Sequence, residues 1–187
     1  MVRTPSKNIT LAEFMMLPET KPASEYIDGQ IIQKPMPQGK HSIIQGEMVS
    51  IINLSVKPKR IARAFPELRC TFDSRSIVPD VAVFTWERIP RDENGQVANV
   101  FQAAPDWTIE ILSPDQRQTK FTKNILHCLN YETHMRWLID PEEQTVFVYI
   151  RNQQPVMLDE LKDLLPVPDF ASELKLTVGD LLGWLSE

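Results

Sequence analysis

Two acidic residues stand out because each lies in or beside an apolar, strand-like segment. Glu110 interrupts the apolar run 107–112, and Asp80 follows Pro79 at the start of the apolar run 81–84. An ionised carboxylate among apolar neighbours loses hydration, so it needs a counter-charge, hydrogen bonds or a metal ion. Side chains alternate between the two faces of a strand, so the carboxylates converge if the strands are neighbours in register. We therefore expect Asp80 and Glu110 to share one site.

The chemistry that fits such a pair is metal-assisted reaction at phosphorus. Carboxylate oxygens suit Mg²⁺ or Mn²⁺, which proteins usually hold with one or two carboxylates, water and phosphate oxygens. The apolar spacing of residues 116–131 predicts an amphipathic helix, on which Lys120 and Lys123 lie one turn apart. Either lysine could neutralise charge that grows on phosphate oxygens, or orient an attacking water.

Other polar residues near this pattern have a structural reading beside a functional one. Asp80 itself could simply be an acid that starts a strand after proline. Glu25 could supply a third acid near the metal, although a surface position at a hairpin edge is favoured. Capping or packing is favoured over catalysis for His41, and a solvent-facing position is favoured for Glu47 on the first long helix. Asp106 follows a proline at a strand entrance, where we expect a solvated acid.

The elements that must position these residues can be read from periodicity, caps and turn residues. An Asp28-Gly29 turn predicts an N-terminal β-hairpin, and a Thr10/Glu13 capping box predicts a short helix before it. A second capping box, Ser42 with Gln45, predicts a long helix that ends before Pro58. The remaining expected elements are strands at 61–65, 68–72, 77–84, 107–112, 136–139 and 145–150, the helix 116–131 and a closing helix near 177–185. The order predicts an α/β fold, a mixed sheet flanked by helices.

Composition limits the class of protein. With 187 residues, we expect residues 1–187 to form a single domain. The net charge of -5 argues against indiscriminate nucleic-acid binding, although local basic faces at 57–69 and 117–123 remain possible. No apolar run approaches the roughly 20 residues of a membrane span, and the start does not resemble a secretory signal, so we expect a cytoplasmic protein. The two cysteines form no close pair, which indicates neither a zinc site nor a disulfide framework.

Several motifs, taken in order, carry a resemblance to a known family. They are Glu25-Tyr26-Ile27-Asp28-Gly29, His41, Pro79-Asp80-Val81-Ala82-Val83, Glu110-Ile111-Leu112-Ser113-Pro114 and Trp137-Leu138-Ile139-Asp140-Pro141. The set is similar to the Uma-two family, and the Pro-Asp strand followed by Glu110 resembles the PD-(D/E)XK nuclease superfamily to which that family is related. The resemblance implies a restriction-endonuclease-like fold that cleaves DNA. It also implies that Asp80, Glu110 and the carbonyl of Ile111 are ligands of Mg²⁺ or Mn²⁺.

The chain departs from this pattern at the lysine. The superfamily places a lysine two residues after the glutamate, which falls here on Leu112. In the Uma-two family the lysine sits on the following helix, and a gap-free count places it at Asn124, between Lys123 and Ile125, with Lys120 one turn earlier. We expect Lys120 or Lys123 to act, with Lys120 ahead because it shares a helix face with Asn124.

Two functions therefore stay open at this point. One is a metal-dependent endonuclease that hydrolyses DNA phosphodiester bonds. The other is a catalytically inactive nuclease-fold module for nucleic-acid binding or protein assembly, which Leu112, Asn124 and the acidic net charge favour. A homodimer is plausible for either, since symmetric oligomers are common and duplex DNA has two strands.

Overall fold

The strands of the protein form two sheets, as the computed structural model shows for residues 9–114 and 131–186. A four-stranded sheet has the order β2-β1-β5-β4, and a six-stranded sheet has the order β10-β9-β8-β7-β6-β3. The first contains β1 Ser24–Ile27, β2 Gln30–Gln33, β4 Cys70–Phe72 and β5 Arg75–Ile77. The second contains β3 Ala62–Pro66, β6 Val81–Thr85, β7 Trp107–Ile111, β8 Met135–Asp140, β9 Thr145–Ile150 and β10 Val156–Leu158. The six-stranded sheet is mixed, because β7 and β8 are parallel and its other pairs are antiparallel.

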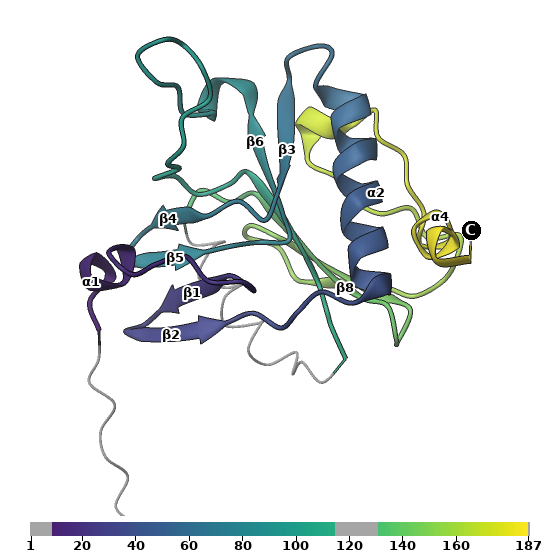
Figure 1. Cartoon of the computed structure of the whole chain (residues 1–187). Helices are drawn as coiled ribbons and strands as arrows, with labels where there is room; N and C mark the ends of the chain where they lie inside the picture. Colours follow the sequence, from purple (N-terminus) through teal and green to yellow (C-terminus); the bar gives the residue numbers. More distant parts are fainter. Residues whose placement is uncertain (1–8, 115–130, 187) are drawn as a thin grey trace, which may run out of the picture.

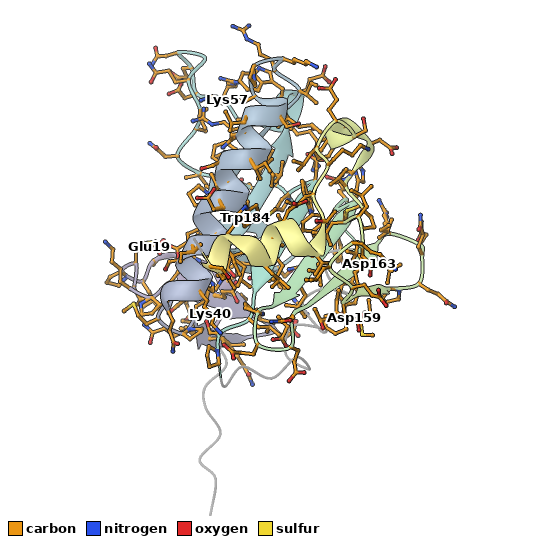
Figure 2. All side chains as sticks on the ribbon, turned by 90° about the vertical axis from the view of Figure 1, so that its right-hand side faces the viewer. Glu19, Lys40, Lys57, Asp159, Asp163 and Trp184 are labelled. Carbon is orange, nitrogen blue, oxygen red and sulfur yellow. The ribbon has the colours of Figure 1, made fainter. Side chains whose placement is uncertain are left out.

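The helices lie on both sides of this arrangement. The described α-helices are α1 Leu11–Met15, α2 Gly39–Val56 and α4 Val178–Gly183, with short 3-10 turns at Trp86–Arg88, Asp169–Ala171 and Trp184–Ser186. Figure 1 shows α2 and α4 on one side of the large sheet, and α1 with the small sheet on the other. Figure 2 looks onto the helical side, where Lys40 and Lys57 mark the two ends of α2. None of the helices in the described ranges is long and apolar enough to cross a membrane.

The main core lies between α2 and one face of the six-stranded sheet. Ile44, Met48 and Ile52 of α2 are fully buried against alternating residues of the central strands, because positions i, i+4 and i+8 share one helix face. Trp107 and Trp137 meet in this core at 5.0 Å between ring centroids, as expected for core residues. Asp80, Thr108 and Glu110 fall on the alternate positions and so lie on the face away from this core.

Several sequence predictions of elements are confirmed. The mixed α/β architecture with flanking helices is present, and so are the hairpin at Asp28-Gly29 and the Thr10/Glu13 capping box. Both turn residues of the hairpin have positive φ, as a two-residue hairpin turn of this type requires. Strand β10 was not predicted. The predicted helix 116–131 lies almost wholly outside the described residues.

Two predictions about elements are wrong. The expected strand 77–84 is two strands in different sheets, because β5 ends at Ile77 and β6 begins at Val81. Pro79 lies in the break, where it has no N–H to give to a strand ladder. Helix α2 begins at Gly39 without a side-chain cap, so the expected Ser42/Gln45 capping box does not form. The side chain of Gln45 instead donates a hydrogen bond to the carbonyl of Asp80 at 2.8 Å.

Candidate functional site

The register of β6 and β7 brings the two predicted acids together. These strands are antiparallel neighbours, with Val81 opposite Ile109 and Ala82 opposite Thr108. Continuing the register by one residue places Asp80 opposite Glu110, and directly opposed side chains in an antiparallel pair are about 5 Å apart at Cβ. Both side chains are buried, with 2% of Asp80 and 5% of Glu110 exposed.

A lysine that the sequence did not single out joins the two carboxylates. Lys34 Nζ lies 2.7 Å from Asp80 Oδ1 and 3.3 Å from Glu110 Oε2. These two oxygens are therefore at most about 6 Å apart, whereas two ligands of one Mg²⁺ or Mn²⁺ ion are at most about 5 Å apart. Lys34 Nζ also donates a hydrogen bond of 2.8 Å to the carbonyl of Val78. Asp80 and Glu110 therefore contact the same ammonium, and their sharing of a metal ion stays a prediction.

Both oxygens of Asp80 are engaged. Oδ1 pairs with Lys34, while Oδ2 accepts a 2.8 Å hydrogen bond from the amide of Ile111. The Nε2 atom of His41 lies 3.1 Å from the same Oδ2. His41 sits in the first turn of α2 and is buried, so its contact with Asp80 goes beyond the packing or capping role that was favoured for it.

Glu110 and Glu25 complete a dense set of charges. Arg136 of β8 is almost fully buried, and its guanidinium lies 3.5 Å from Glu110 Oε1. Glu25 of β1 is only 8% exposed and accepts a hydrogen bond of 2.8 Å from the amide of Val78. The favoured surface position of Glu25 is therefore wrong, because β1 is flanked by β2 and β5 and is not an edge strand.

The environment drives the pKa values of the two central acids apart. Burial raises the pKa of Glu110 to about 7, because it outweighs the attraction of the Lys34 ammonium. Burial acts on Asp80 as well, but the Lys34 ammonium and the His41 hydrogen bond outweigh it and lower that pKa to about 2. Burial also raises the pKa of Glu25, although Lys34 opposes it. Burial would lower the pKa of Lys34, but Glu110, Asp80 and Glu25 together raise it.

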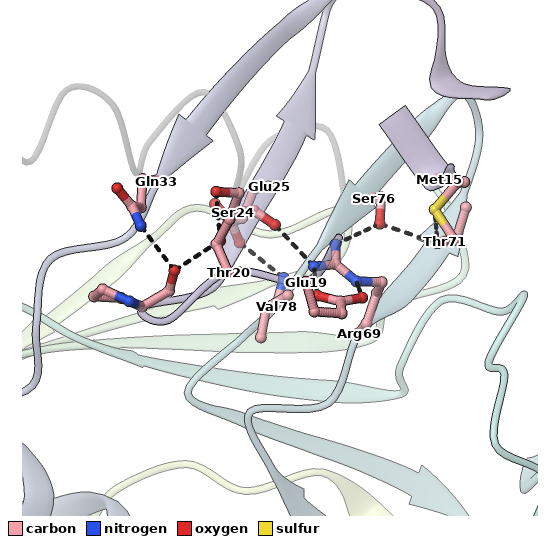
Figure 3. Close-up of polar contacts among 11 residues, drawn as sticks. Met15, Glu19, Thr20, Ser24, Glu25, Gln33, Arg69, Thr71, Ser76 and Val78 are labelled. Carbon is pink, nitrogen blue, oxygen red and sulfur yellow. Dashed lines mark hydrogen bonds and ion pairs between the residues drawn. The ribbon is translucent and has the colours of Figure 1, made fainter. Parts of the chain in front are cut away.

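The small sheet positions Lys34 and Glu25. Lys34 directly follows β2, and its amide donates a 2.9 Å hydrogen bond to the carbonyl of Ala23. Arg69 ties the same sheet to the neighbouring loop, because its guanidinium contacts Glu19, the Ser76 hydroxyl and the Ser24 carbonyl (Figure 3). Glu25 and Lys34 both bind the link 78–80 between β5 and β6. Glu25 accepts a hydrogen bond from the amide of Val78, and Lys34 donates one to the carbonyl of the same residue.

A cleft opens onto this cluster. Its volume is about 470 Å³, and its lining includes Asp80, Lys34, His41 and Ile111. The rim is formed by the loop 19–23 and by Pro35, Met36 and Pro37, which follow Lys34. Asp80 is therefore a buried group at the base of an accessible hollow, which is where a substrate could reach it.

The other predicted positions divide into three outcomes. Lys120 and Lys123 lie outside the described residues, and so does Asn124. Leu112 is buried in an apolar cluster with Leu138, Phe147 and Tyr149, so it cannot do the work of a lysine. The amide of Ile111 contacts Asp80, and the metal contact expected of its carbonyl stays a prediction.

Asp106 is not the solvated acid that its position after a proline suggested. It is 1% exposed, and its Oδ1 lies 2.5 Å from the guanidinium of Arg88. Its Oδ2 accepts hydrogen bonds from the amide and the hydroxyl of Thr85. Asp106 thus joins the start of β7 to the end of β6, at the opposite end of these strands from Asp80 and Glu110.

The donor set at the cleft fits a small, hard cation. Among the described residues, no group of three His, Cys, Asp or Glu side chains is arranged to hold a metal ion. Two carboxylates at one point match the way proteins bind Mg²⁺, which keeps several waters and takes few protein ligands. The Lys34 ammonium supports this fit, because a positive charge already lies against an oxygen of each carboxylate.

Comparison with known proteins gives a family and a structural relative. A family model named Uma2, described as "Putative restriction endonuclease", matches residues 11–179. No curated protein matches. A crystal structure of a putative nuclease belonging to DUF820 from Anabaena variabilis ATCC 29413 is similar to this chain, with 69% sequence identity and a TM-score of 0.93. The match covers 95% of this chain and 99% of that one.

Proposed function

Because this chain belongs to the Uma2 family, we propose that it is an endonuclease that hydrolyses DNA phosphodiester bonds with the help of Mg²⁺ or Mn²⁺. The observation that carries the proposal is the pair Asp80 and Glu110, opposed on neighbouring strands and both in contact with Lys34, with Asp80 lining a cleft. Buried acids with strongly perturbed pKa values in a cleft are typical of a catalytic site.

Asp80, Glu110 and the carbonyl of Ile111 would hold the ion. When bound, such an ion supplies Lewis-acid polarisation of the phosphate and a more acidic water. The protein's own side chains and backbone orient the two carboxylates. His41 and the Ile111 amide fix the Asp80 carboxylate through Oδ2, and Arg136 lies against Glu110 Oε1. Each acid is thereby held in one orientation, which a positioned ligand requires.

Positive charge near the phosphate would come from lysines. Lys34 lines the cleft, and Lys120 and Lys123 stay predicted contributors from the segment after Glu110. An ammonium in this position stabilises charge that develops on phosphate oxygens during hydrolysis. The homodimer and the cytoplasmic location expected from the sequence also stay predictions.

DNA cleavage tests the proposal directly. Purified protein incubated with supercoiled plasmid and Mn²⁺ or Mg²⁺ should nick or linearise it, and EDTA should stop the reaction. Asp80→Asn and Glu110→Gln should each lower the rate by about a hundredfold or more, since each removes a charged ligand. Glu173→Gln, an exposed acid paired with Lys59, is the matched control and should retain full activity. Metal-independent cleavage, or cleavage that survives in both site variants, would contradict the proposal.

Two observations favour a second function. The ammonium of Lys34 already neutralises part of the acidic pair, and Leu112 fills the usual lysine position with an apolar side chain. A nuclease-fold module that binds nucleic acid or a protein without cutting would keep this arrangement. The same plasmid assay separates the two functions, because the module predicts retention of DNA in a mobility-shift gel with no metal-dependent cleavage.

A further inference from the structure

Lys34 is held as a bound cation would be. Its Nζ has three protons and contacts three oxygen acceptors, the carbonyl of Val78 and one carboxylate oxygen each of Asp80 and Glu110. The contacts measure 2.8, 2.7 and 3.3 Å. Val78 and Asp80 lie in the link between β5 and β6 and Glu110 lies in β7, whereas Lys34 directly follows β2.

The oxygens that Lys34 contacts are the ones a metal ion would need. Asp80 Oδ2 is committed to the Ile111 amide and His41, which leaves Oδ1, and Lys34 is on Oδ1. Glu110 Oε1 faces Arg136, which leaves Oε2, and Lys34 is on Oε2. Each carboxylate therefore offers an incoming cation the oxygen that the ammonium now occupies.

Space and charge make joint occupancy unfavourable. A cation held by both oxygens would lie between the two carboxylates and therefore beside the present position of Nζ. Two positive charges at that separation in a buried site repel strongly. The stem of Lys34 is flexible and its residue lines the cleft, so the ammonium has a route toward the opening.

We propose that the Lys34 ammonium and a divalent cation exclude each other at the Asp80–Glu110 pair, which makes Lys34 the residue that sets the metal affinity of this protein. The inference rests on the proposed metal site. Competition of this kind is reciprocal. The ion must displace the ammonium in order to bind, so the loss of the ammonium contacts makes the observed free energy of metal binding less favourable. The displaced ammonium stays in the cleft, where an entering phosphate would meet it.

Mn²⁺ titration of the purified full-length protein, followed by calorimetry, tests this competition. Lys34→Met keeps most of the aliphatic stem and removes the charge, and it should lower the Kd for Mn²⁺ by about tenfold or more. Lys59→Met, which removes an exposed lysine paired with Glu173, is the matched control and should bind as the wild type does. A double variant that carries both Lys34→Met and Asp80→Asn should lose this gain in Mn²⁺ affinity. Equal or weaker binding by folded Lys34→Met, beside measurable binding by the wild type, would overturn the competition and leave the metal site standing.

A second measurement on the unaltered protein does not depend on whether the variant folds. Amine acetylation, read at each lysine by mass spectrometry, should modify Lys34 several times faster when Mn²⁺ saturates the site, because the displaced ammonium is exposed. Lys59 should react at the same rate with and without Mn²⁺. Unchanged or slower labelling of Lys34 at saturating Mn²⁺ would overturn the inference. Absence of Mn²⁺ binding in both the wild type and Lys34→Met would overturn the proposed metal site as well.

Discussion

Asp80 and Glu110 carry the same kind of side chain but meet different surroundings. The Lys34 ammonium, His41 and the backbone amide of Ile111 all contact the Asp80 carboxylate. They stabilise its charged form, so its pKa is lowered. Glu110 is equally buried but less compensated, so burial dominates and its pKa is raised. Two acids with pKa values driven apart in one site are typical of catalytic centres. The surroundings therefore favour the charged form of Asp80 and the neutral form of Glu110.

The raised pKa of Glu110 predicts how stability depends on pH in the absence of metal. A carboxyl whose pKa is higher in the folded state than its ordinary 4.5 stabilises the fold below that value, and this contribution is lost as the pH rises through about 7. Glu110→Gln cannot ionise. Its free energy of unfolding should therefore rise relative to the wild type by roughly 3 kcal/mol between about pH 4.5 and 7. Urea denaturation with EDTA at several pH values measures this difference.

The control for this prediction is Glu142→Gln, which changes an exposed acid paired with Lys40. Its stability relative to the wild type should stay level over the same pH range. If the difference between Glu110→Gln and the wild type is also level, Glu110 does not bind a proton in the folded protein near neutral pH.

At the scale of elements, the site depends on the joint between the two sheets. Residues 78–80 leave the small sheet after β5 and enter the large sheet at β6, and both sheets contribute side chains to this link. Glu25 comes from β1 and Lys34 directly follows β2. His41 and Gln45 come from α2, and Glu110 comes from β7. The break at Pro79 that the sequence prediction missed is thus what allows two sheets to meet at one carboxylate.

The other end of β6 and β7 is fixed by Asp106, which predicts a stability defect without a change in the site. Asp106→Ala removes the buried partner of the Arg88 ion pair and the one oxygen that accepts two hydrogen bonds from Thr85, so the free energy of unfolding should fall by about 3 kcal/mol. Glu132→Gln breaks the exposed contact of the same Arg88 and should cost less than about 1 kcal/mol. Chemical denaturation compares the two variants. If both variants lose similarly small amounts of unfolding free energy, Asp106 behaves as a solvated acid and this prediction is wrong.

At the scale of the whole molecule, the sequence predicted what depends on local pattern. The hairpin turn, the capping box of α1 and the closing helix near 177–185 are local signals, and they indicated the class of fold. Asp80 and Glu110 could be paired because both stand out against apolar strands. Lys34 could not be found in this way, since it reaches Asp80 across 46 residues and Glu110 across 76. Burial of Glu25 likewise depends on how β1 joins β5, which no local pattern encodes.

The central claim is that Asp80 and Glu110 hold one divalent cation. Anomalous diffraction at the manganese edge, from crystals soaked in Mn²⁺, tests it most directly. We predict one strong peak within about 2.1–2.4 Å of Asp80 Oδ1 and Glu110 Oε2, with the Lys34 ammonium moved off both oxygens. A peak elsewhere, or no peak between these carboxylates at saturating Mn²⁺, would contradict the account.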